Sequence, residues 1–129
     1  MAGRMRDVVA AVIEREGRYL IGRRPEHKRH GGLWEFPGGK VQDGEDAAAA
    51  VRRELAEELG LETRSVGALV CSEADEGSPW IIHFLETEVA GTPLPREHSE
   101  VGWFTPDEMA ALPMAPGDAR FVRRLQEMR

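Results

Sequence analysis

Three glutamates near the middle of the chain have the types and the spacing of a metal-binding cluster. Glu54, Glu57 and Glu58 stand at i, i+3 and i+4, so a helix would place their carboxylates on one face. Like charges at this spacing repel one another and destabilise an isolated helix by roughly 0.2–0.5 kcal/mol for each pair. Hard divalent cations bind oxygen ligands and would compensate this repulsion. The cluster therefore predicts a divalent metal site, and a solvated acidic face is the alternative.

The residues around these glutamates favour the metal site over the solvated face. Pro37, Gly38 and Gly39 form a strong turn signal before the predicted helix. Arg53 directly precedes the first glutamate and can orient a carboxylate. Glu45 stands at the expected start of the helix, where the helix dipole stabilises negative charge. A site built by this helix and the loop before it is therefore expected.

The hydrophobic pattern around this helix predicts an α/β fold. A helix is expected over residues 45–59, with Gly60 as its left-handed cap. Strands are expected at 6–14, 18–22, 65–72, 80–89 and 100–104. Thr105 and Glu108 have the spacing of a capping box at the start of a short helix, and a last helix begins near Asp118. Several strands follow one another directly, which favours a mixed sheet covered by helices.

Length and composition indicate one globular domain over residues 1–129. The chain has 41% hydrophobic and 31% charged residues, and no apolar run approaches the roughly 18 residues of a membrane span. Glu14 and Arg15 interrupt the N-terminal apolar stretch, which we interpret as a strand rather than a secretion signal. The single cysteine, Cys71, suits a reducing cytoplasm. The net charge of −6 argues against binding of a nucleic-acid polymer, although a polyphosphate could bind where cations neutralise it.

The stretch from Gly39 to Leu61, GKVQDGEDAAAAVRRELAEELGL, resembles the signature box of the Nudix hydrolases at every fixed position. The segments LWEFPGGK and PMAPGD resemble the MutT-type branch, with the greatest likeness to bacterial CTP pyrophosphohydrolases and 8-oxo-dGTP diphosphatases. The resemblance implies the Nudix fold, an α/β/α sandwich with a mixed β-sheet. It also implies Mg²⁺-dependent hydrolysis of a nucleoside triphosphate, either CTP-like or an oxidised or modified deoxynucleotide. The products would be the nucleoside monophosphate and pyrophosphate.

The resemblance further implies which residues hold the metal. Glu54, Glu57 and Glu58 would ligate Mg²⁺, or Mn²⁺ in its place. The carbonyl of Gly38 would be a further ligand, because a Gly-Gly turn lets the backbone approach closely. Glu45 would act on the metal through water or through another residue. The bound metal would neutralise the polyphosphate and lower the pKa of a water molecule.

A catalytic glutamate outside the box is expected near the C-terminal end of the chain. Glu97 stands six residues before Trp103, where members of the branch carry a catalytic or metal-binding glutamate. Glu100, three residues before the same tryptophan, is its rival, and surface charge is the alternative for both. The predicted catalytic set comprises Glu97 together with three box residues: Arg53, Glu54 and Glu57.

Three further residues are predicted to contact the substrate. Arg24 aligns with a phosphate-contacting arginine of the MutT-type enzymes, and Asp118 aligns with a base-contacting Asn or Asp. An ionised Asp118 would accept hydrogen bonds only and select bases that present donors, but it also stands where a helix cap belongs. Trp80 could stack a base or fill a strand face. No histidine is assigned a ligand role, and His98 is expected to be exposed to solvent.

Two other functions are compatible with the box. One is hydrolysis of ADP-ribose or another molecule linked to a nucleoside diphosphate, which the short chain and the APGD segment disfavour. The other is a non-catalytic nucleotide-binding module, which would be expected to lack box glutamates, and none is missing here. The expected partner is a small nucleotide, and the protein is expected to be a monomer or a homodimer. The preferred base and the attacked phosphorus stay open.

Overall fold

The computed structural model describes residues 6–75 and 77–128, which form two sheets and three helices. One four-stranded sheet has the order β5-β1-β7-β6, and β1 and β7 in it are parallel while its other pairs are antiparallel. The second sheet has the order β2-β3-β4, with β8 paired to β3. The bounds are β1 Arg6–Val12, β2 Glu14–Arg15, β3 Arg18–Arg23, β4 Trp34–Glu35, β5 Gly38–Lys40, α1 Ala47–Leu59, β6 Glu62–Ala74, β7 Trp80–Ala90, β8 Glu100–Phe104, α2 Pro106–Ala110 and α3 Pro116–Glu127.

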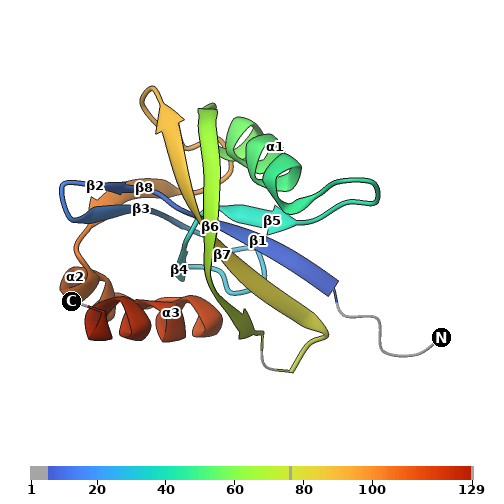
Figure 1. Ribbon diagram of the computed structural model, residues 1–129. Coiled ribbons are helices and arrows are strands. Elements are labelled where there is room, and N and C mark those ends of the chain that lie inside the picture. The colour runs from blue at the N-terminus through green and yellow to red at the C-terminus, as the bar shows by residue number, and fades with distance from the viewer. Residues whose placement is uncertain (1–5, 76, 129) are drawn as a thin grey trace.

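Helices cover the two faces of the first sheet, as Figure 1 shows for α1 and α3. Alternate residues of a strand point to opposite faces, and β1 divides accordingly. Val9 belongs to a core cluster that includes Leu55 of α1. Ala10 belongs to a second cluster that includes Phe121 of α3. The expected α/β/α sandwich with a mixed sheet is therefore confirmed.

The helix that carries the glutamates begins later than its sequence suggests. The predicted start at Glu45 is wrong by two residues, because Asp46 is the cap and its Oδ1 accepts a hydrogen bond from the Ala49 N–H at 2.8 Å. Glu45 therefore lies before the helix, where hydrogen bonds from the Arg53 guanidinium hold its carboxylate. The end of the helix is confirmed at Gly60, whose φ of 64° lies in the left-handed region that glycine tolerates.

The expected strands agree with the hydrophobic pattern, with two differences. The structure also has two short strands that the sequence did not predict, β4 and β5, and β5 includes Gly38 and Gly39 of the predicted turn. The single strand expected at 6–14 is divided into β1 and β2, and these belong to different sheets. The strand expected at 65–72 runs from Glu62 to Ala74, and its pairing with β7 contains register shifts. The strand at 100–104 and the capping box of Thr105 and Glu108 are both confirmed.

The last helix corrects one interpretation of Asp118. Ala115 is the N-cap of α3 and makes no side-chain cap hydrogen bond, so the expectation that Asp118 caps this helix is wrong. The Asp118 side chain instead points into the molecule, where Oδ2 accepts a hydrogen bond from the Phe36 N–H at 2.8 Å. Within residues 6–75 and 77–128, no helix is long and apolar enough to cross a membrane.

An ion-pair cluster ties α3 to the end of β6. The Glu73 side chain is 9% exposed and accepts hydrogen bonds from Arg120 and Arg124 of α3. Burial raises the pKa of the Glu73 carboxyl, but the two arginine contacts outweigh burial and hold its pKa below the ordinary value. The cluster therefore stabilises the packing of α3 whenever Glu73 is ionised.

Candidate functional site

The glutamates of α1 face the glycine turn of β5 at very short range. The Gly38 N–H donates a hydrogen bond to Glu58 Oε1 at 3.3 Å. A Cβ atom on Gly39 would lie 2.1 Å from Glu54 Oε2, so only glycine leaves room for that carboxylate. A Cβ atom on Gly38 would lie 1.9 Å from the carbonyl oxygen of Val9 in the neighbouring strand. The turn therefore lets the backbone of β5 approach two of the three box carboxylates.

The three carboxylates differ in their exposure to solvent. Glu58 is 6% exposed, the Glu54 side chain is 14% exposed, and the Glu57 side chain is 51% exposed. Burial, and then the neighbouring charges of Glu54, Glu35 and Glu97, raise the pKa of the Glu58 carboxyl far above its ordinary value. Burial also raises the pKa of Glu54. Burial and the charges of neighbouring carboxylates therefore both disfavour ionisation of Glu54 and Glu58 when no cation is bound.

Arg53 is the cation that lies among these carboxylates. Its guanidinium donates to Glu45 at 2.7 and 3.0 Å, to Glu54 at 3.0 Å and to Glu57 at 3.2 Å. Its fourth contact is the Lys40 carbonyl at 2.9 Å. The hydrogen bonds with Glu45 raise the pKa of Arg53 above its ordinary value, and they lower the pKa of Glu45. Arg53 thus orients Glu45 as well as Glu54 and Glu57. The sequence had predicted only that Arg53 could orient a carboxylate.

The donor set fits a hard divalent cation. Within residues 6–75 and 77–128, no three acidic, histidine or cysteine side chains lie close enough to hold a metal ion as they stand. Arg53 holds Glu54 and Glu57 on its own guanidinium. The groups are nevertheless all oxygen donors, and a cation would offset both the burial and the neighbouring negative charges that raise the pKa of Glu58. The residues present therefore suit a divalent metal ion.

Two hollows adjoin at the end of the first sheet. One, of about 600 Å³, is lined by Lys40, Trp80, Arg53, Glu54 and Glu57 among others. The other, of about 290 Å³, is lined by Lys40, Trp80, Arg24, Glu35 and Asp118 among others. Lys40 and Trp80 belong to both linings, so the metal-side hollow continues into the hollow that contains Asp118. The structure thus brings the box residues and the three predicted substrate contacts to one connected surface.

The second hollow is lined by a buried acid, Asp118, and by the ion pair of Arg24 and Glu35. The Arg24 guanidinium contacts the Glu35 carboxylate at 3.1 and 3.3 Å. Asp118 is 5% exposed, and burial followed by the negative charge of Glu35 raises its pKa to about 8. A pKa raised to about 8 favours the protonated carboxyl near pH 7 over the ionised form that was expected from the sequence. A protonated carboxyl donates as well as accepts, so this group can read both kinds of base edge.

The two rival glutamates have different surroundings. Glu97 is exposed in the segment between β7 and β8, and its charge contributes to the raised pKa of Glu58. Glu100 lies on β8 beside Arg23, with the ion-pair atoms 3.7 Å apart. Of these two glutamates, Glu97 is therefore the one whose charge contributes to the raised pKa of Glu58.

Trp80 lies at the junction of the two hollows rather than in the core. Lys40 Nζ is 4.6 Å from the centroid of its ring, and the guanidinium carbon of Arg6 is 5.3 Å away. An aromatic face with two cations beside it can hold either a base or an anionic group near those cations. The ring is therefore available to a substrate at the point where base and polyphosphate would meet.

The sequence did not predict two residues that line this surface, Glu35 and Lys40, or the buried position of His98 behind it. Glu35 and Lys40 line the hollows, although neither had been assigned a role. His98 was expected to be exposed, and this is wrong: its side chain is 4% exposed, with Nε2 2.9 Å from Glu35 Oε2. Glu35 and Lys40 stand within LWEFPGGK, so their nearness to the glycine turn was the one available signal.

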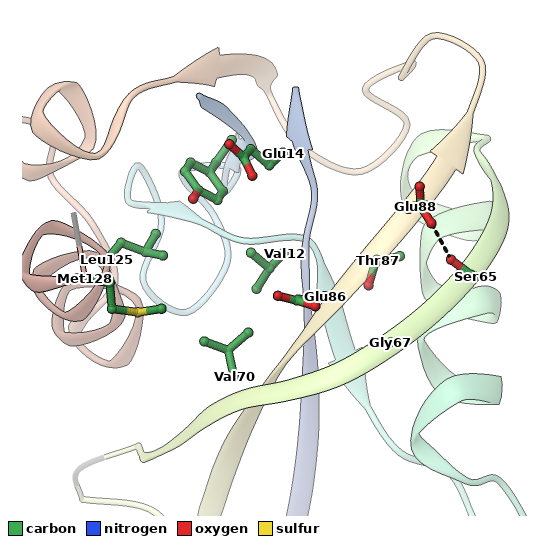
Figure 2. Close-up of a pocket in the computed structure, with 11 residues that line it drawn as sticks. Val12, Glu14, Ser65, Gly67, Val70, Glu86, Thr87, Glu88, Leu125 and Met128 are labelled. Atoms are coloured by element: carbon green, nitrogen blue, oxygen red, sulfur yellow. Dashed lines mark hydrogen bonds between the residues drawn. The ribbon is translucent and has the colours of Figure 1, made fainter. Parts of the chain in front are cut away.

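A third hollow lies away from this surface, between α3 and the strands β1, β6 and β7 (Figure 2). Its volume is about 320 Å³, and Glu14, Glu86 and Glu88 supply its charged groups. The described residues that line it include no lysine or arginine, so its field is unfavourable to a polyphosphate. The hollows around Lys40 and Trp80, in contrast, combine carboxylates with cationic side chains.

Comparison with known proteins agrees with this geometry. The NUDIX domain profile matches residues 3–125. The CTP pyrophosphohydrolase of Escherichia coli is 41% identical over 129 residues, covering 98% of this chain and 95% of that protein. A protein of Mycobacterium tuberculosis named as a putative 8-oxo-dGTP diphosphatase 2 is 36% identical, covering 92% of this chain and 86% of that protein.

Solved structures show the same fold. The E. coli ORF135 protein superposes with a TM-score of 0.82 at 40% identity, over 98% of this chain and 91% of that one. The MutT NUDIX hydrolase of Burkholderia pseudomallei superposes with a TM-score of 0.81 at 29% identity, over 95% of this chain and 98% of that one. The glutamate helix, the glycine turn and the matched profile together assign this chain to the NUDIX family of hydrolases.

Proposed function

We propose that the protein hydrolyses a nucleoside triphosphate, CTP-like or an oxidised or modified deoxynucleotide, to the monophosphate and pyrophosphate with Mg²⁺. The observation that carries the proposal is the pair of adjoining hollows that share Lys40 and Trp80. Carboxylates suited to a divalent cation line one of them, and a buried acid able to read a base edge lines the other. A nucleotide has the same order of parts, with polyphosphate at one end and base at the other.

NUDIX hydrolases generally need a divalent metal, and the α1 carboxylates supply its ligands in this proposal. Glu54, Glu57 and Glu58 hold the cation together with the Gly38 carbonyl, and Glu45 acts through its contacts with Arg53. When bound, the cation neutralises polyphosphate oxygens and lowers the pKa of a water molecule. Mg²⁺ is the expected ion because hard carboxylate and carbonyl oxygens suit it.

The side chains around the hollows perform the remaining tasks. Arg24 and Lys40 line a hollow together with Gly38 and Gly39 of the glycine turn, and from there they place positive charge along the polyphosphate. Arg53 keeps Glu54 and Glu57 oriented. Glu97 accepts a proton from the attacking water as the new P–O bond forms and the bridging P–O bond breaks. Pyrophosphate then leaves with the electron pair of the broken bond. Trp80 and Asp118 contact the base.

The named relatives support this substrate class over a sugar-linked diphosphate. Two relatives that match more than nine tenths of the chain bear names for hydrolysis of CTP and of 8-oxo-dGTP. The base-side hollow of about 290 Å³ also has room for a single base. Hydrolysis of ADP-ribose is the competing outcome that an assay must include.

The test is a panel of substrates incubated with Mg²⁺ and the purified protein. CTP, UTP, ATP, GTP, dCTP, oxidised dGTP and ADP-ribose are compared by kcat/KM, with products identified by ³¹P NMR. Pyrophosphate and a monophosphate from a triphosphate are the expected products. Orthophosphate as the first product, or ADP-ribose cleaved faster than every triphosphate, would overturn the proposal. The variant Glu57→Gln is the matched control for contaminating phosphatase.

A further inference from the structure

His98 lies in the segment between β7 and β8, next to Glu97, and has no role in the function proposed above. Its side chain is 4% exposed, and Nε2 lies 2.9 Å from Glu35 Oε2. The same carboxylate contacts the Arg24 guanidinium through Oε1 at 3.1 Å. His98, Glu35 and Arg24 therefore form one chain of contacts that begins beside Glu97 and ends in the base-side hollow.

The contact with Glu35 decides which nitrogen of His98 carries the proton. As an ion-paired carboxylate, Glu35 only accepts hydrogen bonds, so the Nε2–H of His98 donates to it. His98 Nδ1 is buried and has no hydrogen-bond partner among the described residues. A bare lone pair at Nδ1 is therefore the consistent assignment, because an N–H there would be buried without an acceptor.

The His98 ring fits into the space that Gly22 leaves open beside Glu35. A Cβ atom on Gly22 would lie 2.6 Å from the Cγ and Cδ2 atoms of His98, so the ring occupies the space that a side chain would fill. Gly22 of β3 is also the ladder partner of Glu35 in β4. The absence of a side chain at Gly22 thus places the imidazole directly beside Glu35.

Packing alone does not account for a histidine at this position. An apolar side chain would fill the same space without leaving a buried nitrogen unpartnered, which costs free energy. The backbone already secures the segment, since Ser99 N–H donates to the Arg23 carbonyl at 2.9 Å and Arg96 N–H donates to the Glu58 carbonyl at 3.0 Å. The remaining distinctive contact of His98 is the one with Glu35.

We propose that His98 is a positioning residue that orients the Glu35 carboxylate and, through it, the Arg24 guanidinium at the substrate hollow. The proposal rests on the proposed function for its kinetic consequences. Without the Nε2–H donor, Glu35 loses its contact with His98, and the Arg24 guanidinium, which contacts both Glu35 oxygens and the Arg29 carbonyl, loses the fixed position of its carboxylate partner. Arg24 is then misplaced along the polyphosphate for every nucleotide alike.

The kinetic test uses two replacements of similar size. His98→Met removes the donor and should lower kcat/KM about tenfold or more for all triphosphates. His98→Gln offers an Nε2–H donor and should return kcat/KM to within about threefold of wild type. His83→Met is the matched control, because His83 also contacts a carboxylate, Asp7 Oδ1 at 2.9 Å, but outside the hollows. Full activity of His98→Met, or equal losses for the Met and Gln variants at equal melting temperature, would overturn the proposal.

A double-mutant cycle tests whether His98 acts through Glu35. Glu35→Gln and His98→Met should each lower kcat/KM, and the double variant should be no worse than the more impaired single variant, because both changes remove one contact. Losses that multiply would show that His98 acts independently of Glu35 and would overturn the proposal.

The tautomer gives a readout that does not depend on activity. Long-range ¹H–¹⁵N spectra of the wild-type protein should show His98 as the Nε2–H form, with the signal assigned by its loss in His98→Gln. An Nδ1–H form would overturn the proposal even if the protein hydrolysed no nucleotide. Absence of hydrolysis by wild type with the Nε2–H form present would instead overturn the proposed function and leave the His98–Glu35 contact supported.

Discussion

Replacement of Asp118 by asparagine should change how the stability of the protein depends on pH. Asp118 is 5% exposed, and its pKa is raised from 3.8 to about 8 by burial and by the negative charge of Glu35. The unfolded chain would expose this carboxyl to water and restore its ordinary pKa. Between these two values the folded protein binds one proton more than the unfolded chain does.

The sign and the size of the effect follow from this difference. A carboxyl whose pKa is raised on folding leaves stability intact below the unfolded value of 3.8 and reduces it as the pH rises to about 8. From pH 3.8 to pH 7 the interval is about 3 units, so wild type loses about 4 kcal/mol of unfolding free energy at 1.36 kcal/mol per unit. The asparagine side chain would be neutral throughout and can still accept the Phe36 N–H, so the Asp118→Asn variant escapes this loss.

The assay is urea unfolding of wild type and Asp118→Asn at pH 5 and pH 7.5, with the exposed Asp107→Asn as control. The stability advantage of the Asp118 variant should grow by about 3 kcal/mol over this range. In a second measurement, the ranking of CTP, UTP, ATP, GTP and oxidised dGTP by kcat/KM should change for wild type as the pH passes about 8, because Asp118 then loses its donor. Parallel pH dependence of the two proteins in unfolding would refute the reasoning.

Four further outcomes are expected. Glu57→Gln should lower kcat about 100-fold or more without unfolding the protein, because a half-exposed metal ligand is lost; wild-type turnover at saturating Mg²⁺ would contradict this role. Arg24→Ala should lower kcat/KM for CTP, dGTP and oxidised dGTP by similar factors, since phosphate contacts carry no base information. A loss confined to one base would exclude a phosphate-contacting role for Arg24. Glu97→Gln should lower kcat more than it raises KM, and impairment of Glu100→Gln alone would reverse the choice between them. Glu73→Gln should lower the unfolding free energy by about 1–3 kcal/mol at pH 7. The loss should become progressively smaller below pH 4.5, because protonation of Glu73 in the wild type removes the ion pairs that hold its pKa low, and equal destabilisation at pH 7 and pH 3.5 would argue against these ion pairs.

Local patterns in the sequence predicted the elements that local physics determines. The glutamate helix, its Gly60 cap and the capping box at Thr105 are confirmed because each depends on residues within one or two turns. The same locality explains why the start of the helix was misplaced at Glu45. An acid suits the helix dipole there, but Asp46 one residue later makes the actual cap hydrogen bond.

Contacts between distant segments could not be predicted in this way. Asp118 accepts from Phe36 across 82 residues, and His98 meets Glu35 across 63 residues. Polar residues are mostly exposed, so a histidine or aspartate without a periodic apolar pattern is expected at the surface. Burial of His98 depends on the pairing of β3 with β4 and β8, and burial of Asp118 depends on the backbone pairing of Trp34 with the segment before α3. No local pattern specifies either pairing. The cytoplasmic location and the monomeric or homodimeric state stay predictions from composition and resemblance.

The burial of acids reconciles the acidic composition with a polyphosphate substrate. A net charge of −6 should repel a triphosphate, yet Asp118 in the base-side hollow has a pKa raised to about 8, which favours its neutral form near pH 7, and the divalent cation proposed at Glu54, Glu57 and Glu58 would offset their charge. Glu35 and Glu45 are each matched by an arginine contact. The surface proposed to meet the nucleotide is therefore less negative than the formal charge of the chain suggests. Charge state, rather than the count of acidic residues, decides whether this surface can accept an anion.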